Sequence, residues 1–134
     1  MSQEKFELKD ILGNLKPRIL EGSFVFTTSN DELVHLMKTF KPIATFREEE
    51  GITLVISKDE ADKFNIKYDS LFCCISLGVH SSLNSYGLIS LISSELTKKK
   101  ISSNVFSGFY HDHIFVQADL ADTALQVINS LDHS

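Results

Sequence analysis

Three histidines and one aspartate in the second half of the chain have side chains that could carry chemistry. His111 and His113 flank Asp112, and His80 lies earlier, directly after an apolar segment. Imidazole nitrogens bind zinc well, so an H-x-H pair and a third histidine could form a metal site. A small metal-dependent or histidine-based enzyme is therefore one hypothesis. The alternative is a polar turn, in which short side chains such as that of Asp112 bond to the local backbone.

A second candidate site is the polar stretch that follows the apolar segment LFCCISLGV. His80, Ser81 and Ser82 lie there, just before an amphipathic helix that we expect to open at Leu83 and Asn84. A helix N-terminus presents unpaired N–H groups and a partial positive charge, so a carboxylate could dock on it. The serines could instead serve only as helix caps.

Motifs for common hydrolytic reactions are absent from the sequence. There is no G-x-S-x-G, no H-E-x-x-H and no P-loop. The acidic run Glu48-Glu49-Glu50 is better explained as a solvated hairpin tip than as a metal site, because consecutive carboxylates near a turn do not converge on one ion. We expect no catalytic residue, no bound metal ion and no cofactor.

Composition limits the class of protein. With 134 residues, 43% of them hydrophobic, the chain can bury a core without metals or disulfides. A net charge of -5 argues against nucleic-acid binding, and the basic run at residues 98–100 falls where a helix should end. No signal peptide or membrane span is evident, so we expect a cytoplasmic protein. The adjacent Cys73 and Cys74 should point to opposite faces of a strand, so they cannot easily form a disulfide with each other. We expect both to pack in the core of a protein that resides in a reducing compartment.

Hydrophobic spacing and turn residues predict two successive halves of similar order. In the first half we expect a helix at 7–15, a strand at 23–29, a helix at 33–40, a hairpin at 42–57 and a helix at 58–64 that opens with an S-x-x-E capping box. In the second half we expect a strand at 71–79, a helix through Leu96, strands at 103–109 and 113–118, and a closing helix through Leu131.

The repeated order predicts an α+β fold made of two ferredoxin-like halves, residues 1–68 and 69–134. Crossover connections are right-handed, so both helices of a half should cover one side of a largely antiparallel sheet. Each half lacks one strand by this count. The unpaired sheet edges and a face carrying Phe72, Phe106 and Phe115 would then need covering, which favours a homodimer.

The longer segments of the chain resemble a family of small stand-alone proteins made of two ACT-like halves. The segments that carry the resemblance are LKPRILEGSFVFTT, PIATFREEEGITLVISKDEAD, HSSLNSYGLIS and ISSNVFSGFYHDHIFV, and the likeness extends from about Leu12 to Leu131. It implies βαββαβ topology in each half. ACT domains generally bind amino acids or similar small effectors and pass that information to an associated protein.

The resemblance also implies where a ligand would bind. In ACT domains the loop after the first strand and a facing strand commonly line the effector site, which here correspond to residues 79–83 with Gly87 and to Asn104 with Val105. Gly87 would let the ligand approach the helix closely, and the amide of Asn104 could read its other polar end. The usual glycine-rich loop is replaced by His80, Ser81 and Ser82. The resemblance therefore implies a regulatory module that binds an amino acid and has no catalytic activity of its own.

Overall fold

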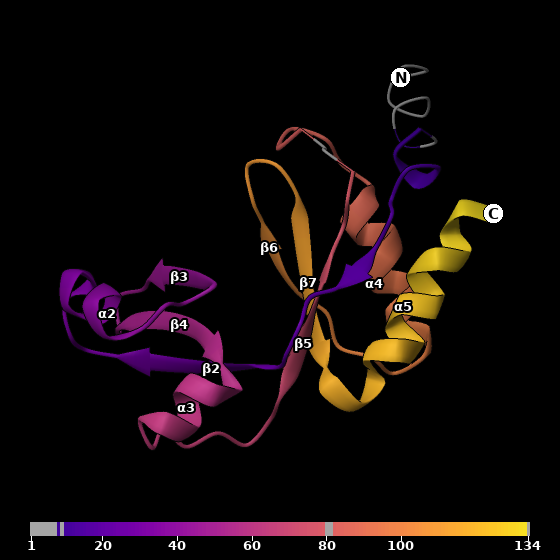
Figure 1. Cartoon of the computed structure of the whole chain (residues 1–134). Helices are drawn as coiled ribbons and strands as arrows, with labels where there is room; N and C mark the ends of the chain where they lie inside the picture. The colour runs from indigo at the N-terminus through magenta and orange to yellow at the C-terminus, as the bar shows by residue number, and fades with distance from the viewer. Residues whose placement is uncertain (1–7, 9, 80–81, 134) are drawn as a thin grey trace. The chain divides into compact units, whose positions relative to one another are not determined.

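The computed structural model describes residues 8, 10–79 and 82–133, and for residues 132 and 133 only the backbone (Figure 1). Its contacts divide the chain into two compact units. Unit 1 comprises residues 1–20 and 73–134, and unit 2 comprises residues 21–72. This division differs from the expected one at residue 68, because the N-terminal segment groups with the second half of the sequence.

Unit 2 is an antiparallel sheet with two short helices. The elements are β2 (Phe24–Ser29), α2 (Leu33–Thr39), β3 (Ala44–Arg47), β4 (Ile52–Ser57) and α3 (Lys58–Lys63). The strands lie in the order β3-β4-β2, and both pairings are antiparallel. The helices and strands expected from the pattern in this part of the sequence are thereby confirmed.

The core of unit 2 lies on the side of the sheet where both helices pack. Leu54 and Ile56 of β4 contact Leu36 of α2 and Ala61 of α3. The predicted capping box is confirmed at one of its two bonds, since the N–H of Glu60 donates to the hydroxyl of Ser57 over 3.1 Å.

In its described residues, unit 1 contains four strands and the longer helices. A short helical segment at residues 8 and 10–12 precedes β1 (Arg18–Ile19); β5 (Phe72–Ser76), α4 (Leu88–Lys98), β6 (Asn104–Ser107) and β7 (Asp112–Gln117) follow, and the chain closes with η1 (Ala118–Leu120), α5 (Ala121–Asn129) and η2 (Ser130–His133). The strand order is β1-β5-β7-β6. β6 and β7 form an antiparallel hairpin.

Strand β1 explains why the N-terminal segment belongs to unit 1. It pairs antiparallel with β5, with Arg18 opposite Ser76 and Ile19 opposite Ile75. The N–H of Leu20 also donates to the carbonyl of Cys74 over 2.8 Å. The strand that was missing from the second half of the sequence is therefore supplied by the beginning of the chain.

The core of unit 1 lies between its sheet and the helices α4 and α5, which Figure 1 shows on the same side of β5 and β7. Ile75 of β5 and Ile114 of β7 form one buried cluster there with Ile92 of α4 and Ile128 of α5. On the other face, Phe115 is buried and packs edge to face against Phe106, with ring centroids 5.7 Å apart. Phe115, one of the residues of the sheet face that was expected to need covering, is therefore already covered within the chain.

Among the residues that the structure describes, no helix has the length and apolar character needed to cross a lipid bilayer.

Candidate functional site

Helix α4 begins later than the sequence pattern indicated. Its first residue is Leu88, and its N-cap is Gly87, whose φ of +103° lies in a region that favours glycine. Leu83 and Asn84 form a turn instead of opening the helix. Hydrogen bonds within the turn hold it together. The N–H of Asn84 donates to the hydroxyl of Ser82 over 3.1 Å, and the N–H of Ser85 donates to the carbonyl of Ser82 over 3.0 Å.

Two of the expected site residues, His80 and Ser81, lie outside the residues that the structure describes. The other residues of that loop can be placed. Ser82, Leu83 and Gly87 line a pocket within unit 1, whereas the Asn84 N–H is already bonded to Ser82.

The pocket has a volume of about 130 Å³ and lies where the loop, the start of α4 and the β6–β7 hairpin meet. Its lining is mostly polar or small, with four serines, one carboxylate and one glycine. The described residues that line it are Ser82, Leu83, Ser85, Tyr86, Gly87, Leu88, Ile89, Ser90, Ser107 and Asp112.

One wall of the pocket is the first turn of α4. The N-cap glycine has no side chain to bond the N–H groups of Leu88, Ile89 and Ser90, and no side-chain cap is formed. The first N–H groups of a helix have no partner within the helix and carry the positive end of its dipole. This wall therefore suits an anionic group.

Another part of the lining is the end of the β6–β7 hairpin, where Ser107 and Asp112 lie. Ser107 and Asp112 are directly paired across the two strands. Alternation along each strand places Ser107 on the same face as Val105, and Asp112 on the same face as Ile114. Val105 and Ile114 both belong to the core beneath the helices, so Ser107 and Asp112 are on the helix side of the sheet.

The structure does not bring Asn104 and Val105 to the pocket. The side-chain amide of Asn104 donates to the carbonyl of Phe115 over 3.4 Å. Val105 packs against the core. The residue of β6 that lines the pocket is Ser107, at the other end of that strand.

The histidines of the hairpin do not form a metal site within the described part of the chain. Nδ1 of His111 lies 3.2 Å from the carbonyl oxygen of Val79, so this side chain links the hairpin to the segment that follows β5. His113 shares a strand face with Phe115, opposite to that of Asp112. No group of three or more His, Cys, Asp or Glu side chains is placed to hold an ion there.

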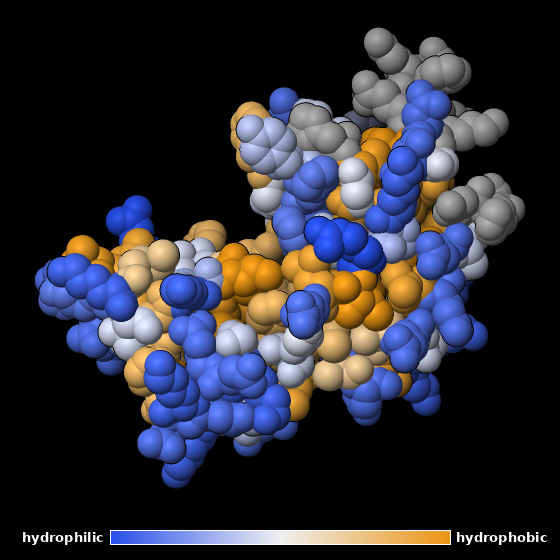
Figure 2. Space-filling view, in the orientation of Figure 1, coloured by the Kyte–Doolittle hydropathy of each residue, from blue (hydrophilic) through white to orange (hydrophobic). Residues whose placement is uncertain are grey.

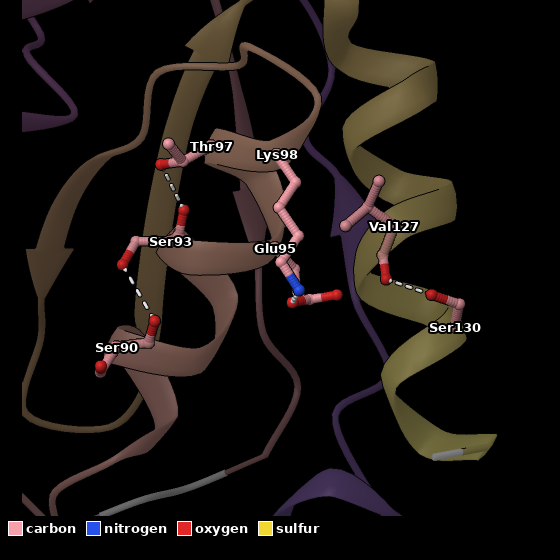
Figure 3. A network of polar contacts seen from close by, with 7 residues as sticks. All are labelled: Ser90, Ser93, Glu95, Thr97, Lys98, Val127 and Ser130. Carbon is pink, nitrogen blue, oxygen red and sulfur yellow. Dashed lines mark hydrogen bonds and ion pairs between the residues drawn. The ribbon is translucent and has the colours of Figure 1, made fainter.

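Two hydroxyls of α4, those of Ser93 and Thr97, bond to carbonyl groups of the helix itself (Figure 3). Ser93 donates to the carbonyl of Ser90 over 3.2 Å, and Thr97 donates to the carbonyl of Ser93 over 2.7 Å. Lys98 and Glu95 form an ion pair at 2.6 Å. Of these residues only Ser90 lines the pocket, and Ser93, Glu95, Thr97 and Lys98 lie further along the helix.

Large apolar side chains lie exposed around the same end of unit 1. Leu83 and Tyr86 belong to the pocket loop, and Phe109 and Tyr110 form the tip of the hairpin, with ring centroids 5.1 Å apart; each of the four is at least 63% exposed. Apolar and polar residues alternate over the face drawn in Figure 2, so hydropathy alone does not mark a site. The pocket geometry distinguishes this end of the unit.

Some pocket residues were missed by reasoning from the sequence. Ser85, Tyr86 and Ser90 follow the stretch that was expected to bind, and their role depends on where α4 begins. Gly87 was a usable signal, since a glycine directly before an apolar helical stripe is compatible with a late helix start. Asp112 was singled out from the sequence only as part of a possible metal site or turn, and Ser107 could be found only from the strand register.

The fold and the pocket together define a class of protein. Its unit is a ferredoxin-like α/β fold with antiparallel strands and a pocket beside a helix N-terminus. The chain belongs to the ACT domain family, because the model of that family, described as ACT domain, matches residues 5–73. Membership of this family supports a ligand-binding regulatory module.

Solved structures share the fold over most of the chain. A protein of unknown function from Vibrio cholerae, described as a possible transport protein, is 38% identical with a TM-score of 0.85, covering 96% of this chain and 98% of that chain. A protein from Agrobacterium tumefaciens is 16% identical with a TM-score of 0.72, covering 89% and 90%.

Escherichia coli aspartokinase III, in complex with aspartate and ADP, is 10% identical with a TM-score of 0.63, covering 90% of this chain and 33% of that chain. At such identities the second and third structures show the fold alone. No curated protein sequence matches the chain.

Proposed function

We propose that this protein is a regulatory module made of two ACT-like halves, which binds an amino acid and has no catalytic activity of its own. The observation that carries the proposal is the polar pocket of unit 1, formed by the loop at Ser82, the start of α4 and the hairpin residue Ser107. Family membership supports the ligand-binding role.

The ligand carboxylate would bind at the first turn of α4. The N–H groups of Leu88 and Ile89 provide donors, and the helix dipole favours the negative charge. The hydroxyls of Ser85, Ser90 and Ser107 add hydrogen-bonding groups around it. Gly87 keeps this end of the helix free of a side chain, so the ligand can approach the backbone.

A regulatory module needs a second surface to transmit what it binds. The apolar side chains of Leu83, Tyr86, Phe109 and Tyr110 are exposed beside the pocket, where a partner could be sensitive to its occupancy.

We propose a homodimer as the assembled form. Light scattering should give twice the 15.1 kDa of one chain at micromolar concentration, and a mass of one chain throughout would contradict it.

Calorimetry with the common amino acids tests the binding proposal, and Ser107→Ala locates the site. Losing a hydrogen bond to a charged ligand group costs about 1.5–3 kcal/mol, so Ser107→Ala should weaken binding roughly tenfold to a hundredfold. Asn104→Ala is the matched control, because it alters the same strand on its other face. Binding lost in Asn104→Ala but kept in Ser107→Ala would place the ligand elsewhere. Absence of binding to any amino acid by the parent protein would remove the proposal.

The alternative of a metal-dependent or histidine-based enzyme gains no support from the described residues. His111 is bonded to the backbone at Val79, and His113 lies on the strand face opposite Asp112.

A further inference from the structure

The sheet of unit 1 has a second face, turned away from the helices. Ile19 of β1 and Ile75 of β5 pack in the core beneath the helices. Successive side chains of a strand point to opposite faces, so their neighbours Arg18 and Ser76 lie on the second face. These two residues are directly paired across the strands, and the Cβ atoms of such partners are about 4.5–5.5 Å apart. A guanidinium and a hydroxyl therefore start from adjacent positions on this face.

An imidazole continues this row on the next strand. β7 lies beside β5, and the N–H of Leu77 donates to the carbonyl of Asp112 over 3.1 Å. These bonded residues adjoin Ser76 and His113, which therefore occupy neighbouring positions of the two strands. His113 lies on the second face, because the residue after it, Ile114, packs in the core. Three polar side chains thus form a row across three strands.

The hydroxyl in the middle of the row lacks a partner. Ser76 is only 6% exposed and is the one buried polar residue in the described part of the chain. Its hydroxyl forms no hydrogen bond with another described residue. Burial of a hydroxyl without a partner is unfavourable. No fully enclosed side-chain oxygen or nitrogen among the described residues is without a partner, so this hydroxyl is still within reach of solvent.

Arg18 adds a positive charge to the same face. Its side chain is exposed and forms no ion pair with another described residue. Burial is the main cause that raises the pKa of the Cys74 thiol to about 12, and the charge of Arg18 acts on that pKa in the opposite direction. The guanidinium therefore lies near Cys74, which precedes Ser76 by two residues on this face. The strand positions of unit 1 that alternation places on this face hold no aspartate or glutamate.

We propose that Arg18 and Ser76, with His113 at the edge of the site, bind a phosphate group on this second face of the unit 1 sheet. A guanidinium forms paired hydrogen bonds with an oxyanion, and the hydroxyl and the imidazole add further donors. Donors from three adjacent strands suit a tetrahedral phosphate better than a planar carboxylate. The inference does not rest on the amino-acid pocket, whose hairpin residues lie on the helix side of the sheet.

Two-dimensional NMR of the whole chain locates the site. Inorganic phosphate is titrated against chloride at the same ionic strength, so that general screening cancels. We expect saturable shifts of the amide signals of Arg18, Ser76 and His113, and unchanged signals for residues 88–90 at the start of α4. Shifts confined to residues 88–90, or no saturable shift, would overturn the inference.

Glycerol 3-phosphate, titrated in parallel, distinguishes the two sources of a phosphate group. Tighter binding than that of inorganic phosphate, with shifts at the same three residues, would identify a phosphate monoester as the ligand. Equal or weaker binding would identify the free ion. Either result supports the site, and neither bears on amino-acid binding.

Arg18→Gln identifies the charge responsible and should weaken phosphate binding roughly tenfold to a hundredfold. Arg47→Gln is the matched control, because it makes the same change in net charge at the other arginine of the chain, which is exposed in β3 of unit 2. It should leave the affinity unchanged. Equal affinities in the two variants would overturn the inference.

Ser76→Ala provides a second variant that keeps the charge of Arg18. It removes only the hydroxyl and should weaken phosphate binding about tenfold or more. Unchanged affinity in Ser76→Ala would overturn the role of the buried hydroxyl and with it the site. If either variant fails to fold, the shifts measured on the parent protein still decide.

Discussion

The two adjacent cysteines show how strand alternation sets the chemistry of a single residue. Cys74 is fully buried, and burial is the main cause that raises the pKa of its thiol to about 12. Cys73 lies on the helix side, is partly buried, and also has a raised pKa, chiefly through burial. The thiolate is the reactive form of cysteine, so both residues are poor nucleophiles at neutral pH. Their placement in the core was predicted from the sequence.

The raised pKa of the Cys74 thiol predicts that the free energy of unfolding changes with pH in the alkaline range. In the unfolded chain the thiol ionises near its ordinary pKa of 9.0, while in the folded protein it stays protonated until about pH 12. Between these values the unfolded state binds fewer protons, so the free energy of unfolding falls as pH rises, by at most about 1.4 kcal/mol per pH unit.

Other groups titrate in this range, so the measurement compares the parent with Cys74→Ala. Their difference in free energy of unfolding by urea should be constant from pH 6 to 8 and should change in favour of the variant above pH 9. A difference that stays constant to pH 11 would contradict the assignment.

At the scale of elements, most of the helices and strands could be predicted because their apolar periodicity is strong. The strands β2, β4 and β6 lie within the expected ranges, β7 begins one residue before its expected range, and the register of β6 on β7 is that of a simple hairpin. The start of α4 could not be predicted. Serine is a favourable N-cap residue, so residues 81 and 82 were reasonable candidates from the sequence. The Ser82 hydroxyl instead accepts a hydrogen bond from the N–H of Asn84 in a turn, and the N-cap of the helix is Gly87.

Gly87→Ala separates the conformational role of this glycine from its role in binding. A side chain at φ +103° is strained, at a cost of about 1–2 kcal/mol in the free energy of unfolding. Gly22→Ala is the control, because Gly22 has φ +85° and no neighbouring atom within 4 Å of an added Cβ. Chemical denaturation should show similar losses of stability in both variants.

Only Gly87→Ala should also weaken amino-acid binding in calorimetry, because only Gly87 lines the pocket. Equal affinities in the two variants would show that the ligand does not approach the α4 terminus.

At the scale of the whole molecule, the sequence could not reveal which half the N-terminal segment joins. The spacing of Leu8, Ile11, Leu12 and Leu15 predicts an apolar stripe, and all four contact the core of unit 1. A two-residue strand such as β1 has no periodicity to detect, and its partner β5 lies more than fifty residues along the chain. Pairing between such distant segments depends on the tertiary fold.

Leu15→Ala tests this assignment of the N-terminal segment. Leu15 is fully buried in the core of unit 1, so the substitution should cost about 2–5 kcal/mol. Hydrogen exchange should accelerate in β5, α4 and α5 more than in β3 and β4. Leu54→Ala, at an equally buried position in the core of unit 2, should produce the opposite pattern. The same pattern in both variants would show that the two units open together.

In the sequence, unit 2 lies between β1 and β5, and this order has a consequence for how the chain folds during synthesis on the ribosome. Residues 21–72 emerge as one continuous stretch and can complete their own core. Residues 10–20 emerge earlier than unit 2 but have no partner until β5 and the two helices after it are made. This segment is therefore translated before unit 2 yet reaches its folded position after it, and its apolar residues stay accessible to chaperones in the interval.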